Sequence, residues 1–188
     1  LSFPETRLFD DDQNRQWFGV KRFDRTSNGR IHMHSAAGVL QANFRLPSIR
    51  YESLLKLTSA LTRRKNDLLA IYRLAIFNVV FHNKDDHAKN FAFTMDQEGS
   101  WRLAPGFDLT FSTGMKNQHM SDVLGLGQGI TLDQLRLLGN KAGVSRKEQK
   151  EIIDEVLSTR SFLKKEMAGY GLERHSVLRK LEDHWKKL

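Results

Sequence analysis

One polar segment, residues 83–90, carries most of the side chains that could do chemistry. It reads Asn-Lys-Asp-Asp-His-Ala-Lys-Asn and lies between two apolar runs. Within it Asp85 and Asn90 are five positions apart, the same separation as the aspartate and the asparagine of the protein-kinase catalytic loop. In that loop the aspartate orients or deprotonates a substrate hydroxyl, and the asparagine oxygen binds a magnesium ion. The spacing therefore favours a phosphotransfer site over a solvated turn.

A second carboxylate, Asp108, follows at a distance that a β-hairpin would close. Two short apolar runs, 91–95 and 101–105, flank a turn and predict that hairpin. The hairpin would return Asp108 to Asp85 and Asn90, where its carboxylate could bind the magnesium ion that bridges the β and γ phosphates. An aspartate that caps the next turn is the plain alternative, and one residue can fill both roles.

Three further side chains of the polar segment have supporting roles in this hypothesis. His87 is expected to orient the loop through a hydrogen bond, and this structural role is favoured over catalysis. Lys89 could offset the negative charge of a transition state. Asp86 is expected to be solvated, because ligation of one ion by two adjacent aspartates is less natural.

A transition-metal hydrolase site is a competing interpretation. It would combine His32 and His34 with the aspartates of the polar segment. The two histidines fall on a separate predicted hairpin, and the chain has no His-x-x-x-His or similar ligand spacing. This interpretation is therefore disfavoured.

The elements that must position the polar segment are mainly helical. Helical length and periodicity occur at residues 51–61, 68–81, 132–138, 147–158 and 174–188. The run at 68–81 is apolar almost all round, which is typical of a buried central helix that delivers the polar segment. N-caps are expected at Asn66 or Asp67 for this helix, and at Thr131 and Ser145 for two later ones.

The part of the chain before these helices predicts strands. Residues 1–15 are polar and are expected to be irregular, whereas residues 17–23 and 30–34 read as a hairpin around the turn Ser27-Asn28-Gly29. A short helix or loop capped by Ser35 should follow, with a break at residues 46–48. Residues 112–130 are glycine-rich and predict a loop.

The composition limits the classes of protein to which the chain can belong. The chain has 188 residues, which suits one domain with a sizeable core. It has no cysteine, so disulfides and thiolate metal sites are excluded. No signal pattern or uninterrupted membrane-length run occurs, and a cytoplasmic protein is expected. The net charge of +8 favours anionic partners, although a solvated surface rich in lysine would account for it as well.

Two motifs of the chain resemble those of a known family. The segments Asp85–Phe91, Asp-Asp-His-Ala-Lys-Asn-Phe, and Leu103–Leu109, Leu-Ala-Pro-Gly-Phe-Asp-Leu, are similar to motifs of the HipA family of bacterial serine/threonine kinases, which are toxins of toxin–antitoxin systems. Val20–Arg25 resembles the hinge strand of that family, and Gln41 with residues 46–52 resembles the segment after it. The resemblance runs from about residue 17 to 112, and more loosely through the helical remainder.

The resemblance implies an α+β fold: a protein-kinase-like C-terminal lobe, mainly helical, with short β-hairpins at the active site. One domain over residues 1–188 is expected, with a hinge region at 1–50, central helices and catalytic loops at 51–112, and a helical part at 113–188. The N-terminal lobe of the family, with its phosphate-holding loop, ATP-binding lysine and regulatory serine, is largely missing here. A fragment with low or no activity alone is therefore expected.

The resemblance also assigns roles to individual residues. Asp85 corresponds to the catalytic aspartate, with Lys89 beside it, and Asn90 and Asp108 correspond to the magnesium ligands. The expected nucleotide-binding residues are Lys21, Phe23, Gln41, His87 and Phe107. The chain departs from the family pattern at Lys21, where an acidic residue is expected, and at Asp86, where glycine is common.

The activity implied by the resemblance is phosphoryl transfer with ATP and Mg²⁺ to a protein substrate, which for the best-known members is an aminoacyl-tRNA synthetase. The implied partner is a HipB-like DNA-binding antitoxin, with DNA contacted only indirectly and no membrane involved. Two alternatives stay open. A phosphatidylinositol-kinase-like lipid kinase shares the Asp-x-His-x-x-Asn spacing, and a non-catalytic module that binds an antitoxin or DNA would suit the basic charge.

Overall fold

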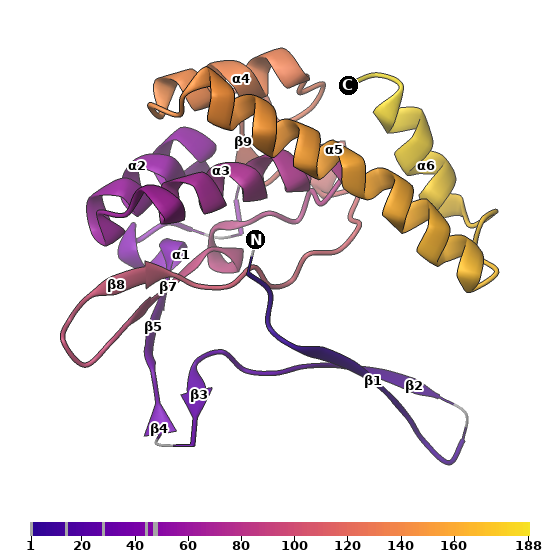
Figure 1. Ribbon diagram of the computed structural model, residues 1–188, viewed down its shortest axis with the longest axis horizontal. Helices are drawn as coiled ribbons and strands as arrows, with labels where there is room; N and C mark the ends of the chain where they lie inside the picture. Colours follow the sequence, from indigo (N-terminus) through magenta and orange to yellow (C-terminus); the bar gives the residue numbers. More distant parts are fainter. Residues whose placement is uncertain (1, 14, 28, 44, 47–48) are drawn as a thin grey trace.

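Helices form the body of the protein, and short strands lie along one side of it. The computed structural model describes residues 2–13, 15–27, 29–43, 45–46 and 49–188. The predicted turn residue Asn28 and the predicted break at Pro47 and Ser48 lie outside the described residues. Figure 1 shows the helical body with most of the strands below it.

The two central helices are α2 (Tyr51–Thr62) and α3 (Lys65–Val80), which pack against each other. Apolar residues occur almost all round α3, so that α3 is buried between α2 and the long helix α5 (Arg146–Gly169). Its core side chains include Ile71 and Ile76, which are fully buried. The predicted central helix is thus confirmed.

The start of α3 differs from the prediction. Arg64 is the N-cap residue and makes no side-chain cap, so neither Asn66 nor Asp67 caps the helix. The Asp67 carboxylate instead accepts a hydrogen bond from the Leu103 backbone N–H at 3.1 Å. This bond links the helix to a residue of the sheet that lies 36 positions later in the sequence. No local sequence pattern predicts a contact over such a separation.

The C-terminal helices are α4 (Leu132–Lys141), α5 and α6 (Ser176–Trp185). The predicted caps are confirmed, because both Thr131 and Ser145 form capping boxes. Helix α5 continues eleven residues beyond the predicted end at 158. Among the described residues, no helix combines the length and apolarity that a membrane crossing requires.

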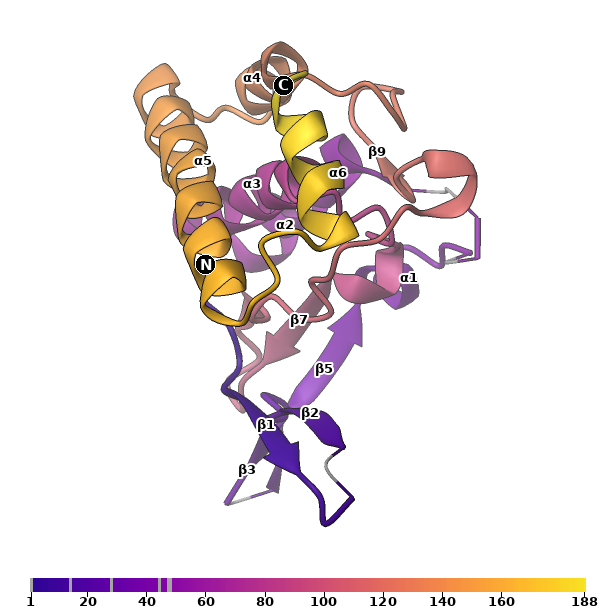
Figure 2. The ribbon, with the colours of Figure 1, turned by 90° about the vertical axis from the view of Figure 1, so that its right-hand side faces the viewer.

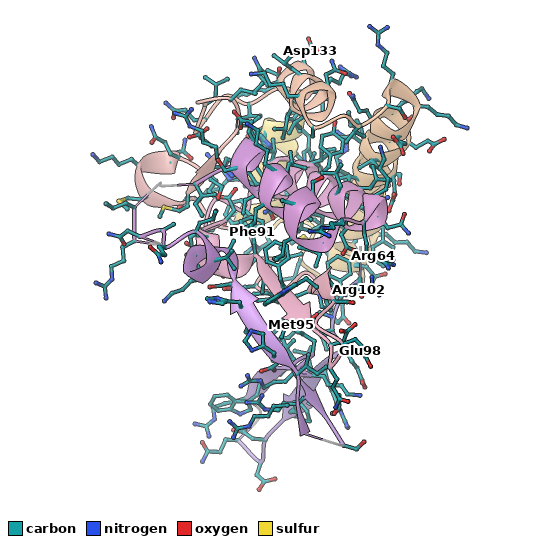
Figure 3. All side chains as sticks on the ribbon, turned by 90° about the vertical axis from the view of Figure 1, so that its left-hand side faces the viewer. Arg64, Phe91, Met95, Glu98, Arg102 and Asp133 are labelled. Atoms are coloured by element: carbon teal, nitrogen blue, oxygen red, sulfur yellow. The ribbon has the colours of Figure 1, made fainter. Side chains whose placement is uncertain are left out.

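A three-stranded antiparallel sheet lies under α1 (Ala36–Val39) and α3. Its order is β5 (His32–Ser35), β7 (Ala92–Met95) and β8 (Trp101–Leu103). The hairpin of β7 and β8 confirms the prediction for 91–105. Figure 3 shows Phe91, just before β7, close to the helical body and Met95 farther out along the strand. Phe91 is buried, so this end of the hairpin is held in the core.

The pairing predicted between 17–23 and 30–34 is wrong. Strand β5 pairs with β7 instead, and the predicted turn at 27–29 joins only the two-residue strands β3 (Arg25–Thr26) and β4 (Gly29–Arg30). The Ala36 N–H donates to the Phe91 carbonyl at 2.7 Å, which holds β5 and α1 against the start of β7. As predicted, Ser35 caps α1 through its side chain.

Residues expected to be irregular form a strand. Strand β1 (Thr6–Asp10) pairs with β2 (Gln16–Val20) in an antiparallel hairpin that stands apart from the helices in Figures 1 and 2. The Asp11 carboxylate accepts from the backbone N–H groups of Gln13 and Arg15 and so closes the turn. The sequence did not predict this strand, because both faces of the hairpin are exposed. Without a buried face, apolar and polar residues need not alternate along a strand. Strand β2 ends at Val20, so residues 21–23 are not part of it.

The glycine-rich region at 112–130 is mostly loop, as predicted. It contains a short 3-10 turn, η2 (Met115–Asn117), and strand β9 (Ser121–Asp122). Strand β9 pairs in parallel with β6 (Ile49–Arg50), directly before α2. This pairing anchors the loop against the start of α2.

Candidate active site

The polar segment follows the C-terminal end of α3. After Val80 the chain turns through His82, whose φ of 56° is left-handed, and the Asn83 N–H then donates to the Asn78 carbonyl at 2.9 Å. Side chains of α6 satisfy two of the last carbonyls of α3: His184 Nε2 bonds to the Val79 carbonyl and Trp185 Nε1 to that of Val80. The position of the polar segment therefore depends on α6 as well as on α3.

Asp85 and Asn90 are joined within the loop. The Asn90 side chain, which is nearly buried in the 3-10 turn η1 (Ala88–Asn90), donates from Nδ2 to the backbone carbonyl of Asp85 at 2.9 Å. This bond occupies the amide nitrogen and leaves the amide oxygen as the atom of Asn90 that can bind a cation. The Asp85 side chain is exposed. The pair thus presents a carboxylate and an amide oxygen from one short loop.

Asp85 lines an open hollow of about 520 Å³. His87 lines the same hollow, so the structure brings these two predicted residues together. The hollow is also lined by Ser112, Thr113 and Gly114, which belong to the segment after Asp108. A substrate side chain could reach the Asp85 carboxylate through this opening.

Asp108 lies in a segment that is fixed at both of its ends. At one end the Ala104 N–H donates to the Ala92 carbonyl at 2.9 Å, two residues after Asn90. At the other end the Ser112 N–H donates to the His82 carbonyl at 3.0 Å and the Ser112 carbonyl accepts from the Lys84 N–H at 3.3 Å. These bonds return the chain to the polar segment at Lys84, and the position of Asp108 beside Asp85 and Asn90 stays a prediction.

The backbone of Asp108 is left-handed, with a φ of 55°. This conformation costs a residue other than glycine about 1 kcal/mol, although aspartate and asparagine tolerate it better than most. Its exposed carboxylate forms no ion pair among the described residues. An exposed carboxylate on a strained backbone is typical of a functional position. Carboxylate and amide oxygens are the ligands that Mg²⁺ prefers, so Asn90 and Asp108 fit the ion in chemical type.

Two of the predicted nucleotide-binding residues contact each other. The rings of Phe23 and Phe107 lie 5.5 Å apart at an angle of 40°. This contact places the segment after β2 directly beside the residue that precedes Asp108. The two rings together offer an apolar surface next to the proposed magnesium ligand.

Other predicted residues are placed apart from the hollow. Lys21 bonds to Glu5 twice, through its backbone N–H at 2.8 Å and through Nζ at 3.1 Å. Gln41 follows α1 with a left-handed φ of 51°. Among the described residues, the hollow is lined by Asp85 and His87 of the predicted site and not by its other members, which are Lys21, Phe23, Gln41, Lys89, Asn90, Phe107 and Asp108.

Asp86 is buried, and the prediction of a solvated side chain is wrong. Its Oδ2 accepts from Tyr51 Oη at 2.7 Å and lies 2.9 Å from His119 Nδ1. Its Oδ1 accepts from the backbone N–H groups of Met120 and Ser121 at 2.8 and 3.2 Å. Burial, and then the nearby Asp86 carboxylate, raise the pKa of Tyr51 well above its usual value, so the tyrosine stays a donor.

Asp86 therefore joins three parts of the chain. Tyr51 begins α2, and its Oη also accepts a hydrogen bond from Asn78 of α3 at 2.9 Å. His119 belongs to the glycine-rich loop, and the Ser121 hydroxyl donates to the Asp86 carbonyl. Asp85 and Asp86 thus face opposite environments: one carboxylate is exposed, and the other is buried and holds the loop in place. Tyr51 and His119 were not predicted, because their partner lies more than 30 positions away.

His82 makes the stability of this region depend on pH. Burial, followed by the charge of Lys84, lowers the pKa of His82 to about 4, whereas an unfolded histidine titrates near 6.5. Between these values the unfolded state binds more protons, so stability should decrease as the pH falls from about 6.5 to 4. We expect a loss on the order of 1–2 kcal/mol, reduced from the full linkage value because the side chain is partly exposed. Urea unfolding at several pH values measures this loss.

The variant His82→Asn isolates this effect, because asparagine tolerates the left-handed backbone. It should flatten the decrease and leave the part due to other groups, which include His184, whose pKa is lowered by burial, and Glu148, whose pKa is lowered by hydrogen bonds from Ser145. Equal slopes in the two proteins would show that His82 is not the group that titrates.

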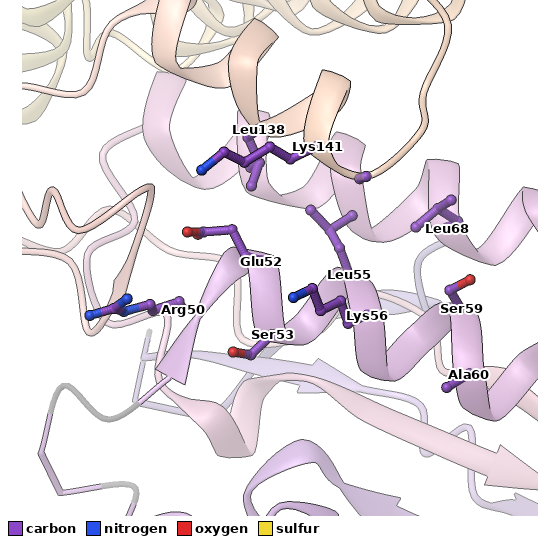
Figure 4. Close-up of a pocket in the computed structure, with 11 residues that line it drawn as sticks. Arg50, Glu52, Ser53, Leu55, Lys56, Ser59, Ala60, Leu68, Leu138 and Lys141 are labelled. Carbon is purple, nitrogen blue, oxygen red and sulfur yellow. The ribbon is translucent and has the colours of Figure 1, made fainter.

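A larger cavity lies elsewhere, between α2 and α4. Figure 4 shows this space of about 660 Å³, with Glu52, Leu55 and Lys56 on α2 facing Leu138 and Lys141 on α4. Glu52 is already engaged, because its Oε2 accepts from the Leu124 N–H at 3.1 Å. None of the predicted site residues is among the described residues that line this cavity, so the hollow at Asp85 is the better candidate for an active site.

Comparisons with known proteins place this geometry in a family. A protein of Sinorhizobium fredii (strain NBRC 101917 / NGR234) named "Putative kinase Y4mE" is 29% identical over 134 residues, which is 64% of this chain and 31% of that protein. A chain of the Shewanella oneidensis MR-1 toxin–antitoxin complex of HipA, HipB and its operator DNA matches with a TM-score of 0.71 at 15% identity. That match covers 100% of this chain and 46% of the other, so this chain spans less than half the length of either protein.

The structural match confirms the predicted fold class, the kinase-like fold of HipA with mixed helices and short strands. The family model of the HipA-like C-terminal domain matches residues 1–161. This match covers both the polar segment and Asp108, and it confirms the resemblance inferred from their motifs. The chain belongs to the HipA-like C-terminal domain family.

Proposed function

We propose that the protein containing this chain is an ATP- and magnesium-dependent serine/threonine kinase and that the hollow at Asp85 is its catalytic centre. The observation that carries the proposal is the hydrogen bond from Asn90 Nδ2 to the Asp85 carbonyl. It ties the Asn90 amide to the backbone of Asp85, so that one short loop offers an exposed carboxylate and an amide oxygen that can bind a cation, the two kinds of group that phosphoryl transfer requires. The name of the Sinorhizobium relative supports the same activity class.

In the proposed mechanism Asp85 orients the acceptor hydroxyl in the hollow and accepts its proton. The Asn90 amide oxygen and the Asp108 carboxylate would hold Mg²⁺, which when bound neutralises charge on the transferred phosphoryl group. Lys89 contributes positive charge near the loop, and His87 forms part of the wall beside Asp85. Phe23 and Phe107 offer apolar surface for the adenine base.

Membership of the family supports proposals for the class of substrate and the class of partner. We propose a protein serine or threonine as the acceptor, with an aminoacyl-tRNA synthetase as the first candidate to test. The Shewanella structure contains HipB and operator DNA, so a HipB-like antitoxin is the proposed partner, and DNA would be contacted through that partner. The net charge of +8 is compatible with a complex of this kind.

The full-length protein, incubated with labelled ATP, Mg²⁺ and separate protein and inositol-lipid acceptors, tests the proposal. Transfer to protein supports it, and transfer to lipid alone would instead make the protein a lipid kinase. Retention of an antitoxin or of DNA without any Mg²⁺-dependent ATP binding would make the chain a non-catalytic binding module.

Asp108→Asn tests the assignment of the metal ligand. Asparagine keeps the left-handed backbone but removes the negative charge that attracts the cation. We expect the Mg²⁺ concentration for half-maximal activity to rise about tenfold or more, in line with the loss of a charged ligand. A titration of activity with Mg²⁺ measures this shift. Asp96→Asn, in the turn between β7 and β8, is the matched control, and a normal Mg²⁺ requirement in Asp108→Asn would contradict the assignment.

A further inference from the structure

A cavity of about 710 Å³ lies where α6 packs beside the end of α3. It is separate from the hollow at Asp85, and Thr113 is the residue that lines both. Its walls come from the loop after α3, from the glycine-rich region and from α6. Its basic and imidazole side chains are His82, Lys84, His119, Lys180, His184 and Lys187.

The charge of this cavity is positive and only weakly compensated. Asp183 is the one carboxylate among its described lining residues, and it is already paired with Lys186 at 3.0 Å. Within the described part of the chain, neither Lys180 nor Lys187 forms an ion pair. Both lysines are exposed at the mouth of the cavity. Their ammonium groups are therefore available to a ligand.

Lys84 is the buried cation of the cavity, with only 5% of its surface exposed. Its Nζ donates to the backbone carbonyl and to the side-chain oxygen of Asn117, at 2.8 and 2.7 Å. An ammonium group has three N–H donors, so one remains. Burial lowers the pKa of Lys84. An anion that entered the cavity would offset this cost of desolvation.

The histidines add polar ring nitrogens to the walls of this cavity. His119 uses Nδ1 in its contact with Asp86, which leaves Nε2 for another partner. His82 Nδ1 is buried without a hydrogen-bond partner among the described residues. Buried polar atoms usually have a partner, so the His82 ring keeps an unused hydrogen-bonding position in the wall of this cavity.

We propose that this cavity binds the phosphate group of a small phosphorylated ligand, at a site separate from the proposed magnesium–nucleotide site. Lysine ammonium groups are well suited to phosphate, and the volume is that of a small-molecule site rather than of a single ion. Because Lys84 directly precedes Asp85 and Thr113 lines both spaces, such a ligand would contact the two segments that form the catalytic hollow. The site is thus placed to regulate the proposed kinase.

Calorimetric titration with inorganic phosphate and with pyrophosphate, in EDTA and without nucleotide, tests the site. The variant Lys180→Gln/Lys187→Gln should weaken binding about tenfold or more, because two charge-assisted contacts are lost. The control Lys147→Gln/Lys165→Gln removes the same charge from exposed positions of α5 outside the cavity and should bind as the wild type does. Circular dichroism checks that both variants fold.

Tighter binding of pyrophosphate would support a diphosphate ligand, and equal binding of the two probes would support a phosphate monoester. Equal losses in the two double variants would overturn the proposal, because attraction to the net charge alone would explain them. Absence of binding by the wild type would overturn it as well. Because EDTA removes Mg²⁺ and no phosphate is transferred, the result is independent of whether the protein is a kinase.

Discussion

Replacing Asp85 by asparagine should lower the rate of phosphoryl transfer by about 10²–10⁴-fold, the usual contribution of a positioned general base. Asparagine can still contact a hydroxyl but cannot take its proton. The substitution should not disturb the loop, because Asn90 bonds to the backbone carbonyl of Asp85 and not to its carboxylate. Transfer of labelled phosphate by the full-length protein gives the rate, and calorimetry with Mg²⁺ and ATP shows whether nucleotide affinity is kept.

Asp12→Asn is the matched control for this prediction. Asp12 is exposed in the turn between β1 and β2 and, within the described part of the chain, forms no hydrogen bond or ion pair with the polar segment, so the same chemical change there should leave the rate unaltered. Wild-type turnover in Asp85→Asn would remove Asp85 from the catalytic role and with it the proposed mechanism. A lower rate that comes with weaker ATP affinity would place Asp85 among the ligand-binding groups.

The parts of the site that could be predicted are those set by short separations. Asp85 and Asn90 lie in one loop, so their relation follows from a spacing of five residues and the 3-10 turn between them. The hairpin of β7 and β8, which precedes Asp108, has a short turn that local turn chemistry encodes. These features need little knowledge of the remaining chain.

The strand pairing of the N-terminal region could not be predicted in the same way. The local pattern of strand β5 does not select its neighbour, and its pairing with β7 joins residues about 60 positions apart in the sequence. Strands β1 and β2 pair with each other although neither has a buried face. Where no face is buried, hydrophobic alternation carries little information on register or partner.

The different environments of Asp85 and Asp86 could not be predicted from the sequence either. Two adjacent aspartates look alike in a sequence. Asp86 has a structural role because Tyr51 and His119, from distant segments of the chain, contact its carboxylate. A buried carboxylate with several donors is costly to desolvate, and its hydrogen bonds compensate for that cost. The sequence shows the carboxylate but not its donors.

Replacing Asp86 by alanine should lower the free energy of unfolding by about 3–5 kcal/mol, the usual cost of breaking a buried charged network. The change would leave the Tyr51 hydroxyl, the His119 ring and two backbone N–H groups buried without their acceptor. Since a domain of this kind has about 5–15 kcal/mol of stability in total, the loss would be a large fraction of it. Urea unfolding followed by circular dichroism measures it.

Asp183→Ala is the control for the loss of a carboxylate, because Asp183 forms an exposed ion pair with Lys186 on α6 and should cost less than about 1 kcal/mol. Asp86→Asn should fall between the two, since its amide oxygen can still accept while its amide nitrogen meets a donor. A loss below about 1 kcal/mol in Asp86→Ala would contradict the structural role of this carboxylate. If the role holds, Asp86 positions the catalytic loop through α2 and the glycine-rich region. Activity should then decrease in Asp86→Asn even where the protein is still folded.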